Sequence, residues 1–494
     1  MFNKILIANR GEIAVRVIRA CKELGITAAA VFSDADRTAL HTILADESYY
    51  IGPSQASASY LNKEKIIEVA KQINADAIHP GYGFLSENPD FIKLVEDSGI
   101  IFIGPSSASV KMMGNKTEAR ALMKMNNVPI VPGTTKPIKN AEEGIQRSLE
   151  IGFPVLLKAS AGGGGKGMRR INSKDEFIDN YDAVKRESAK AFANDDVYIE
   201  KLIVNPRHIE VQILGDKFGN YVHLFERECS IQRRHQKIIE EAPSPFVDDV
   251  TRDNITRSAL NAAKACSYYN AGTIEFLMDS EKNFYFLEMN TRIQVEHPVT
   301  EMITSRDLVK EQIRIASGEK LSFTQNDLNI HCHAIEVRIY AEDPENNFLP
   351  STGMIGNYSE PSGFGVRVDP GACSGSTVTM FYDPILSKLI CWDSSRENVI
   401  KKALRALSEF NITGINTNLA FLISVLNNKN FIEGNFDINF LEREGFLLSN
   451  LTNQSANELH RAATIVAGIL KLKTNVVPEK LPKIHNDWLS QNYE

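Results

Sequence analysis

Residues 154–171, PVLLKASAGGGGKGMRRI, place four consecutive glycines between two apolar, strand-like segments. Ordering so many glycines costs much backbone entropy, and a structural turn needs only one or two of them. Such a run is typical of a loop whose backbone amides approach a phosphate closely. The stretch therefore indicates a nucleotide-binding protein.

Two common phosphate-binding motifs do not fit this loop. Gly162, Gly164 and Gly167 match G-x-G-x-x-G, but a dinucleotide-binding fold requires a helix to begin there. Here Met168–Ile171 is strand-like, and the next helix is predicted from Ser173. Walker A requires Ser or Thr after the lysine, where this chain has Gly167. The pattern predicts a strand–glycine loop–strand flap that closes over a nucleotide.

Lys158 lies on the strand that enters this flap. As a point charge it could meet the phosphates. The alternative is a solvated surface lysine.

Length and composition exclude several classes of protein. The 494 residues are 43% hydrophobic and 24% charged, as in globular proteins, and predict about three domains. No apolar run approaches the roughly 18 residues of a membrane span, and Arg10 and Glu12 interrupt any signal peptide. The net charge of −7 argues against nucleic acid as a partner. The six cysteines form no C-x-x-C pair, so we expect a cytoplasmic protein.

Strand and helix signals alternate over residues 1–115 and predict an open parallel sheet. The expected strands are Lys4–Ala8, Ala28–Phe32, Ala77–His79 and Ile101–Ile103. Ligands bind outside the carboxyl ends of such strands, so the loops 9–12 and 79–83 are candidate sites. The alternative is that their glycines and proline simply make turns.

Further along, a linking helix is expected within 116–132, with its helical signal over Lys116–Asn127. A compact segment around the glycine run covers 133–203, and a strand-rich and then helical region follows over 204–330 and 331–446. The last part, 447–494, is more polar and predicts an added extension.

The segments Thr273–Met278 and Phe284–Asn290 predict a hairpin that places Glu275 directly opposite Glu288. Facing carboxylates repel each other in a sheet, and a hard divalent cation removes that repulsion. Asn290, on the same face, adds a third oxygen ligand. The pattern favours Mg²⁺ or Mn²⁺; the alternative is two glutamates on a wet face.

Polar residues continue beyond this hairpin at every second position. An extended chain would put them all on one face, next to the proposed metal. Two carboxylates, two amides and an arginine together favour a site for a small anion with an acid/base group. The residues are Glu288, Asn290, Arg292, Gln294 and Glu296.

Two further features point to anion chemistry. The cluster Arg227–Lys237 lies between apolar strands, which favours an anion site, although a solvated patch or an RNA contact is the alternative. Arg338 lies on a strand-like run, where an arginine is usually paired or functional.

A set of segments together resembles the biotin carboxylases of the ATP-grasp superfamily: Lys158–Met168, Arg207–Gln212, Arg227–Lys237, Glu288–Thr300 and Glu336–Pro344. The resemblance runs from Lys4 to about residue 445. It implies an α/β ATP-grasp enzyme with an N-terminal open parallel-sheet domain (1–115), a mobile glycine-loop lid (133–203), a body (204–330) and a C-terminal mixed α+β domain (331–446). In that family ATP activates bicarbonate as carboxyphosphate, and the CO₂ passes to biotin N1.

The resemblance also implies residue roles. Nucleotide contacts would be Lys116, Lys158, Gly164, Gly165, Glu200, Lys201, His208, Gln232 and His235. Metal ligands would be Glu275, Glu288 and Asn290, and the bicarbonate pocket Lys237, Arg292, Gln294 and the Val295 backbone. Glu296 would be the base, Arg338 the stabiliser of the biotin enolate, and Tyr82 and Gly83 the lining of the ureido ring.

ATP and Mg²⁺ (or Mn²⁺) would be the cofactors. The expected partners are a biotin carboxyl carrier protein, a carboxyltransferase subunit and a second copy of the chain. Met123-Lys124-Met125 is similar to a biotinylation site but lies in a predicted helix far from the C-terminus. Biotin is therefore expected on a separate carrier. The final acceptor, acetyl-CoA, propionyl-CoA or pyruvate, stays open.

Two other functions fit the motifs less well. Another ATP-grasp ligase, such as a carbamoyl-phosphate or purine-pathway enzyme, would lack Arg227–Lys237 and the run from Arg292 to Glu296. A non-catalytic nucleotide-binding subunit would lack the base or Arg338.

Overall fold

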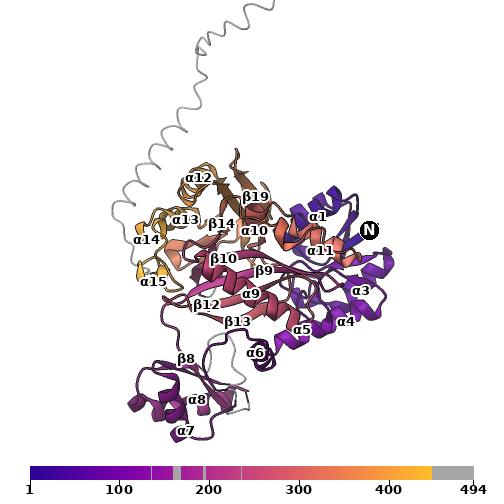
Figure 1. Ribbon diagram of the computed structural model, residues 1–494. Helices are drawn as coiled ribbons and strands as arrows, with labels where there is room; N and C mark the ends of the chain where they lie inside the picture. Colours follow the sequence, from indigo (N-terminus) through magenta and orange to yellow (C-terminus); the bar gives the residue numbers. More distant parts are fainter. Residues whose placement is uncertain (135, 160–167, 193–195, 235, 448–494) are drawn as a thin grey trace, which may run out of the picture. The chain divides into compact units, whose positions relative to one another are not determined.

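The computed structural model describes residues 1–134, 136–159, 168–192, 196–234 and 236–447. Its first part is an open sheet of five parallel strands in the order β3-β2-β1-β4-β5. One face packs on α1, and the other packs on α3 and α4. The predicted parallel sheet is confirmed (Figure 1).

The elements of this part alternate as the sequence predicts. They are β1 (Lys4–Ile7), α1 (Gly11–Glu23), β2 (Thr27–Ser33), α2 (Leu40–Leu44), β3 (Glu47–Gly52), α3 (Lys63–Gln72), β4 (Ala77–His79), α4 (Pro89–Asp97), β5 (Ile101–Phe102) and α5 (Ser107–Gly114). Helix α6 (Lys116–Met125) follows and contains the Met-Lys-Met tripeptide, as predicted.

A small antiparallel sheet in the order β7-β6-β8 carries the strands on either side of the glycine run. Its strands are β6 (Val155–Ala159), β7 (Met168–Ile171) and β8 (Val197–Lys201), and its helices are α7 (Ala141–Ile151) and α8 (Phe177–Phe192). The predicted helix start at Ser173 is four residues early, because a 3₁₀ turn precedes α8 and the Ser173 side chain makes no cap bond. The loop 160–167 lies outside the described residues.

The largest sheet has eight strands in the order β13-β12-β9-β10-β11-β14-β21-β19, all antiparallel neighbours. It continues across residue 330, because β11 pairs with β14 and puts Ile239 opposite Val337. The expected body and C-terminal segments therefore share one sheet.

The elements up to residue 330 are β9 (Arg207–Gly215), β10 (Tyr221–Arg233), β11 (Gln236–Ala242), α9 (Asp249–Ala265), β12 (Asn270–Met278), β13 (Phe284–Asn290), α10 (His297–Thr304) and α11 (Leu308–Ala316). After it come β14 (His333–Tyr340), β15 (Glu342–Asp343), β16 (Leu349–Pro350), β17 (Gly353–Met354), β18 (Tyr358–Ser359), β19 (Val366–Pro370), β20 (Thr377–Val378), β21 (Ile385–Asp393), α12 (Arg396–Glu409), β22 (Asn411–Ile412), α13 (Leu419–Leu426), α14 (Lys429–Ile432) and α15 (Phe440–Arg443).

Strand β9 shows that the two faces of the large sheet carry different side chains. Ile209, Val211 and Ile213 pack with α9 in one apolar cluster. Figure 1 shows α9 beside β9 and β10. Successive side chains of a strand point to opposite faces, so the alternate residues His208, Glu210 and Gln212 face the other way. They are buried as well. One face of the sheet therefore forms the core, and the other presents buried polar groups.

All six cysteines are free thiols, in agreement with the sequence. Within the described ranges, no helix is long and apolar enough to cross a membrane.

Candidate active site

The predicted opposition in the metal hairpin is confirmed: Glu275 on β12 lies opposite Glu288 on β13, and a register shift separates this pair from Phe276 opposite Phe286. The Glu275 carboxylate is 5% exposed. Its Oε1 accepts from Lys237 Nζ at 2.9 Å and from Asn290 Nδ2 at 2.8 Å. His208 Nε2 lies 3.1 Å from Oε2. Burial alone would raise the pKa of Glu275, but Lys237 and His208 outweigh it and hold that pKa well below its usual range.

The predicted extended chain beyond Asn290 is wrong. Strand β13 ends at Asn290, and residues 291–296 form a loop with a turn that leads into α10. Residues 291–296 pair with no strand, so strand alternation no longer orients their side chains. The polar groups converge all the same, because Gln294 Nε2 donates to Glu275 Oε1 at 2.8 Å and Arg292 donates to Asn290 Oδ1 at 2.8 Å.

Glu296 lies between two cations. Its Oε1 accepts from Lys237 Nζ at 2.6 Å, and its Oε2 accepts from Arg338 Nη2 at 2.9 Å. The residue is 2% exposed. Burial alone would raise the pKa of Glu296, but Lys237, Arg338 and Arg227 outweigh it and keep that pKa well below its usual range. Glu296 is therefore ionised at neutral pH.

Arg338 also approaches Glu240 Oε1, at 2.6 Å. Glu240 on β11 faces Glu336 on β14 across the sheet. Burial raises the pKa of Glu240 to about 7 and that of Glu336 well above its usual range. Glu240 and Glu336 are therefore at most partly ionised near neutral pH, and Glu296 is the ionised partner of Arg338.

Arg292 is held from the N-terminal part of the chain. Its Nε donates to Glu87 Oε2 at 2.8 Å, and Glu87 Oε1 accepts from the Thr291 backbone at 2.9 Å. Arg292 also donates to Ile293 O and Asn290 Oδ1, so three of its five N–H groups are hydrogen-bonded. Among the described residues, no acceptor is hydrogen-bonded to the other two N–H groups. Local sequence patterns did not identify Glu87, which lies 205 residues from Arg292.

Arg227 supports the site instead of binding an anion. Its side chain is fully buried and donates to acceptors on β9, β12 and α10 and in the 291–296 loop. The acceptors are Glu210 Oε1 (2.6 Å), Gln212 Oε1 (2.8 Å), Thr273 Oγ1 (3.2 Å), Thr300 Oγ1 (2.9 Å) and Gln294 Oε1 (2.8 Å). The sequence predicted an anion site over Arg227–Lys237, and its first residue, Arg227, does not belong to such a site.

Glu210 is a site residue that the sequence reasoning missed. It is fully buried and contacts both Arg227 and Lys237. The alternation of polar and apolar residues along 207–213 is the signal that could have revealed it.

The expected nucleotide contacts fall into two groups. Lys158 and Glu200 form an ion pair in the small sheet, while Lys201 Nζ donates to Gly152 O at 2.7 Å. In the large sheet, Gln232 Nε2 lies 3.0 Å from His208 Nδ1. The remaining expected contacts are the Lys116 side chain, Gly164, Gly165 and His235, which lie outside the described residues.

The loop with Tyr82 and Gly83 is fixed by Asn9, whose Nδ2 donates to Pro80 O at 2.6 Å and Tyr82 O at 2.7 Å. Gly81 has φ +60°, and a side chain there would meet Asn9 Nδ2 at 2.9 Å. Both strand-end loops that the sequence singled out are therefore in direct contact.

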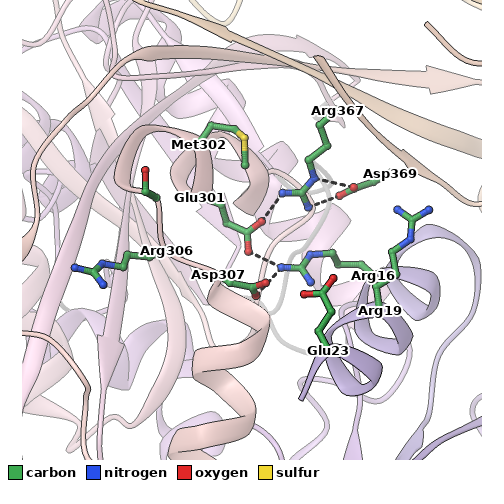
Figure 2. A pocket seen from close by; sticks show the side chains of 10 residues that line it. Arg16, Arg19, Glu23, Glu301, Met302, Arg306, Asp307, Arg367 and Asp369 are labelled. Carbon is green, nitrogen blue, oxygen red and sulfur yellow. Dashed lines mark hydrogen bonds and ion pairs between the residues drawn. The ribbon is translucent and has the colours of Figure 1, made fainter. Parts of the chain in front are cut away.

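A separate pocket of about 420 Å³ lies between α1, α10 and β19 (Figure 2). Figure 2 shows Arg16 and Arg367 turned toward Glu301, at 2.9 and 2.7 Å. Arg16 also pairs with Asp307 at 2.6 Å, and Arg367 with Asp369 at 2.8 Å. The charges of its walls largely neutralise one another, which distinguishes it from the cation-rich surroundings of Glu296.

Three family models match the chain in succession. Residues 1–110 match the biotin carboxylase N-terminal domain, 115–324 the ATP-binding domain of the carbamoyl-phosphate synthase L chain, and 336–443 the biotin carboxylase C-terminal domain.

Known proteins match over nearly the same length. Biotin carboxylase 1 of Bacillus subtilis is 51% identical over 90% of this chain and 98% of its own. The biotin carboxylase domain of 2-oxoglutarate carboxylase from Hydrogenobacter thermophilus, solved as a dimer with MgADP and bicarbonate, is 48% identical with a TM-score of 0.83 and covers 90% of this chain and 99% of its own. A bicarbonate-bound structure of the thermophilic 2-oxoglutarate carboxylase domain has a TM-score of 0.87 at 47% identity, with the same coverage.

Proposed function

The chain belongs to the biotin carboxylase family, ATP-dependent enzymes that carboxylate biotin, and on this premise we propose that the cluster around Glu296 is its catalytic centre. One observation carries the proposal. The Glu296 carboxylate joins Lys237, at 2.6 Å, to Arg338, at 2.9 Å. A single carboxylate thus contacts the lysine proposed for bicarbonate and the arginine proposed for biotin.

Lys237, Arg292, Gln294 and the Val295 backbone form the proposed bicarbonate pocket. The two remaining N–H groups of Arg292 suit a planar carboxylate-like anion, which a guanidinium binds as a fork. Lys237 adds a point charge that already contacts Glu275 at 2.9 Å and Glu296 at 2.6 Å. Bicarbonate bound there lies next to the base.

Glu296 accepts the bicarbonate proton and creates the nucleophile that attacks the terminal phosphate of ATP, forming carboxyphosphate and ADP. In the free enzyme Lys237 and Arg338 depress its pKa, and this makes it a weak base. When these cations turn toward bound anions, Glu296 loses part of that stabilisation and becomes more basic.

The donor set on the hairpin fits Mg²⁺, because Glu275, Glu288 and Asn290 offer carboxylate and amide oxygens on paired strands. Bound Mg²⁺ supplies charge neutralisation for the phosphates. Lys158 and Glu200 on the small sheet and His208 and Gln232 on the large sheet are the proposed nucleotide contacts. Lys116, Gly164, Gly165, Lys201 and His235 complete this proposal.

Arg338 is proposed to stabilise the enolate-like ureido oxygen of biotin. Guanidinium stays charged at any working pH. Tyr82 and Gly83, in the loop fixed by Asn9, are proposed to line the ureido ring.

We further propose that biotin arrives on a separate carrier protein, that a carboxyltransferase subunit takes the carboxyl group onward, and that the chain forms a homodimer. Relatives support this assembly. A pyruvate carboxylase subunit of Methanothermobacter thermautotrophicus is 51% identical, and the mitochondrial propionyl-CoA carboxylase alpha chain of Sus scrofa is 49% identical. Similar identity to enzymes of different acceptors supports the proposal that a partner subunit selects the acceptor.

The decisive experiment is Glu296→Ala, assayed for ATP cleavage at saturating bicarbonate. We expect normal nucleotide binding and a loss of the bicarbonate-dependent rate by about 10²–10⁴-fold, typical of a lost acid/base group. Glu241→Gln is the matched control, since Glu241 is equally buried but bonded to Arg396 and His333. If Glu296→Ala only raises the bicarbonate requirement and keeps the saturated rate, Glu296 is not the base.

A further inference from the structure

Lys388 on β21 is a fully buried lysine. Its Nζ donates to Val295 O at 2.7 Å and lies 3.2 Å from Glu12 Oε2. Asp369 Oδ2 is further away, at 3.9 Å. Thus a charge from the C-terminal part of the sheet bonds the backbone next to Glu296, and Glu12 in the first turn of α1 is its nearest carboxyl group.

We propose that Lys388, held by Glu12, is a positioning residue of the bicarbonate pocket, and this inference rests on the pocket proposed above. The ammonium fixes the carbonyl of Val295 and with it the turn that carries Gln294 and Glu296. Lys388 does not touch the reacting atoms.

The need for such a residue follows from the loop. Residues 291–296 have left the sheet, so ladder hydrogen bonds no longer fix them. Side chains fix them instead: Glu87 bonds Thr291, Arg227 bonds Gln294, and Lys388 bonds Val295. Burying an ammonium group costs free energy that a neutral donor would avoid. A charged donor with an ionic partner, in return, holds the carbonyl in one direction.

Lys388 keeps its charge in this environment. Burial alone would lower the pKa of Lys388, but Glu12, Glu336 and Asp369 outweigh it and raise that pKa.

Glu12 also connects Lys388 with the loop that is proposed to bind biotin. It lies in the segment 9–12, which leads into α1, and Asn9 at the start of that segment bonds the carbonyls of Pro80 and Tyr82. One short segment therefore supports the proposed biotin loop directly and the proposed bicarbonate loop through Lys388. This gives the segment 9–12 a role that its sequence alone did not reveal.

The test is the double variant Lys388→Met/Glu12→Gln, which removes the ion pair without leaving one of its charges alone. We expect the KM for bicarbonate to rise about tenfold or more, as for a lost charged hydrogen bond, with the KM for ATP unchanged and a smaller effect on kcat. Lys402→Met is the control, because Lys402 also bonds a backbone carbonyl, Trp392 O at 2.9 Å, and pairs with Asp393 at 2.7 Å. It should leave the KM for bicarbonate unchanged.

An unchanged bicarbonate KM in the double variant, or a parallel loss of ATP affinity, would overturn the inference. If the double variant does not fold, the single variant Glu12→Gln is the test, because it keeps the Lys388 donor. We expect a smaller rise in the KM for bicarbonate. An unchanged KM would reject the positioning role of Lys388 and Glu12. Absence of bicarbonate-dependent ATP cleavage in the wild-type protein would refute the proposed pocket itself, separately from Lys388.

Discussion

Lys237 contacts the carboxylates of Glu210, Glu275 and Glu296, and this single ammonium therefore joins the proposed metal, bicarbonate and base positions. Burial alone would lower the pKa of Lys237, but these three carboxylates raise it well above its usual value. The lysine stays charged through a reaction cycle at neutral pH. It can orient an anion, whereas it cannot serve as a proton donor there.

Arg338→Gln should separate the two halves of the reaction. We expect biotin carboxylation to be lost, while much of the bicarbonate-dependent ATP cleavage remains, because Lys237 still holds Glu296 at 2.6 Å. The measurement compares carboxybiotin formation with ADP release on the same enzyme. Equal loss of both activities would assign Arg338 to the nucleotide or bicarbonate step.

Single residues show where prediction from sequence reaches its limit. Arg338 was singled out because an arginine on a strand-like run is usually paired or functional, and Glu296 because it continues an alternating row of polar residues. Glu87 and Lys388 were not, because their partners Arg292 and Val295 lie 205 and 93 residues away. Only the folded sheet brings such partners together.

At the scale of elements, the hairpin β12–β13 carries the proposed metal site. Glu275→Gln and Glu288→Gln should each raise the Mg²⁺ concentration needed for half-maximal activity and cut turnover by about two orders of magnitude or more. A Mg²⁺ titration of ATP cleavage at saturating bicarbonate measures both effects. Identical titration curves for the wild type and both variants would remove the hairpin from the metal site.

Glu241 on β11 forms an ion pair with Arg396 on α12, and the contribution of this pair to the stability of the fold should depend on pH. Burial alone would raise the pKa of Glu241, but Arg396 and His333 outweigh it and lower that pKa to about 2. A depressed carboxyl pKa stabilises the fold above the unfolded value, near 4.5, and this contribution is lost as the pH falls toward 2. It amounts to about 3 kcal/mol at neutral pH.

Glu241→Gln tests this dependence by thermal denaturation. The variant should be clearly less stable than the wild type at pH 7, and the difference should shrink between pH 5 and about 3 as the wild-type carboxyl takes up its proton. A difference in melting temperature that stays constant over this range would contradict the assignment.

The hairpin and the segment after it show why one sequence prediction held and the other failed. The opposition of Glu275 and Glu288 held for a reason that the sequence does not show. Next to the turn Phe276 pairs with Phe286, and a register shift between Glu275 and Phe276 then brings Glu275 opposite Glu288. The alternation beyond Asn290 failed because an alternating sequence requires a neighbouring strand to stay extended, and the sequence does not report where the pairing ends.

For the molecule as a whole, the shared eight-stranded sheet predicts that the regions before and after residue 330 unfold together. The pairing of β11 with β14 and the ion pair of Arg338 with Glu296 cross this boundary. Native-state hydrogen exchange in low urea should give amides of β11 and β14 the same opening free energy. Earlier opening of β14 would show that residues 331–446 form an independent unit.

The hydrogen bonds of Arg227 restrict which substitutions this position can tolerate during evolution. Its one guanidinium bonds five side chains from four segments, so no other residue type can replace all of these bonds at once. Evolutionary drift at this position would need several compensating substitutions together. In a library of random single variants selected for growth on the enzyme's activity, codon 227 should therefore remain arginine, while the exposed residues Lys71 and Gln72 vary freely.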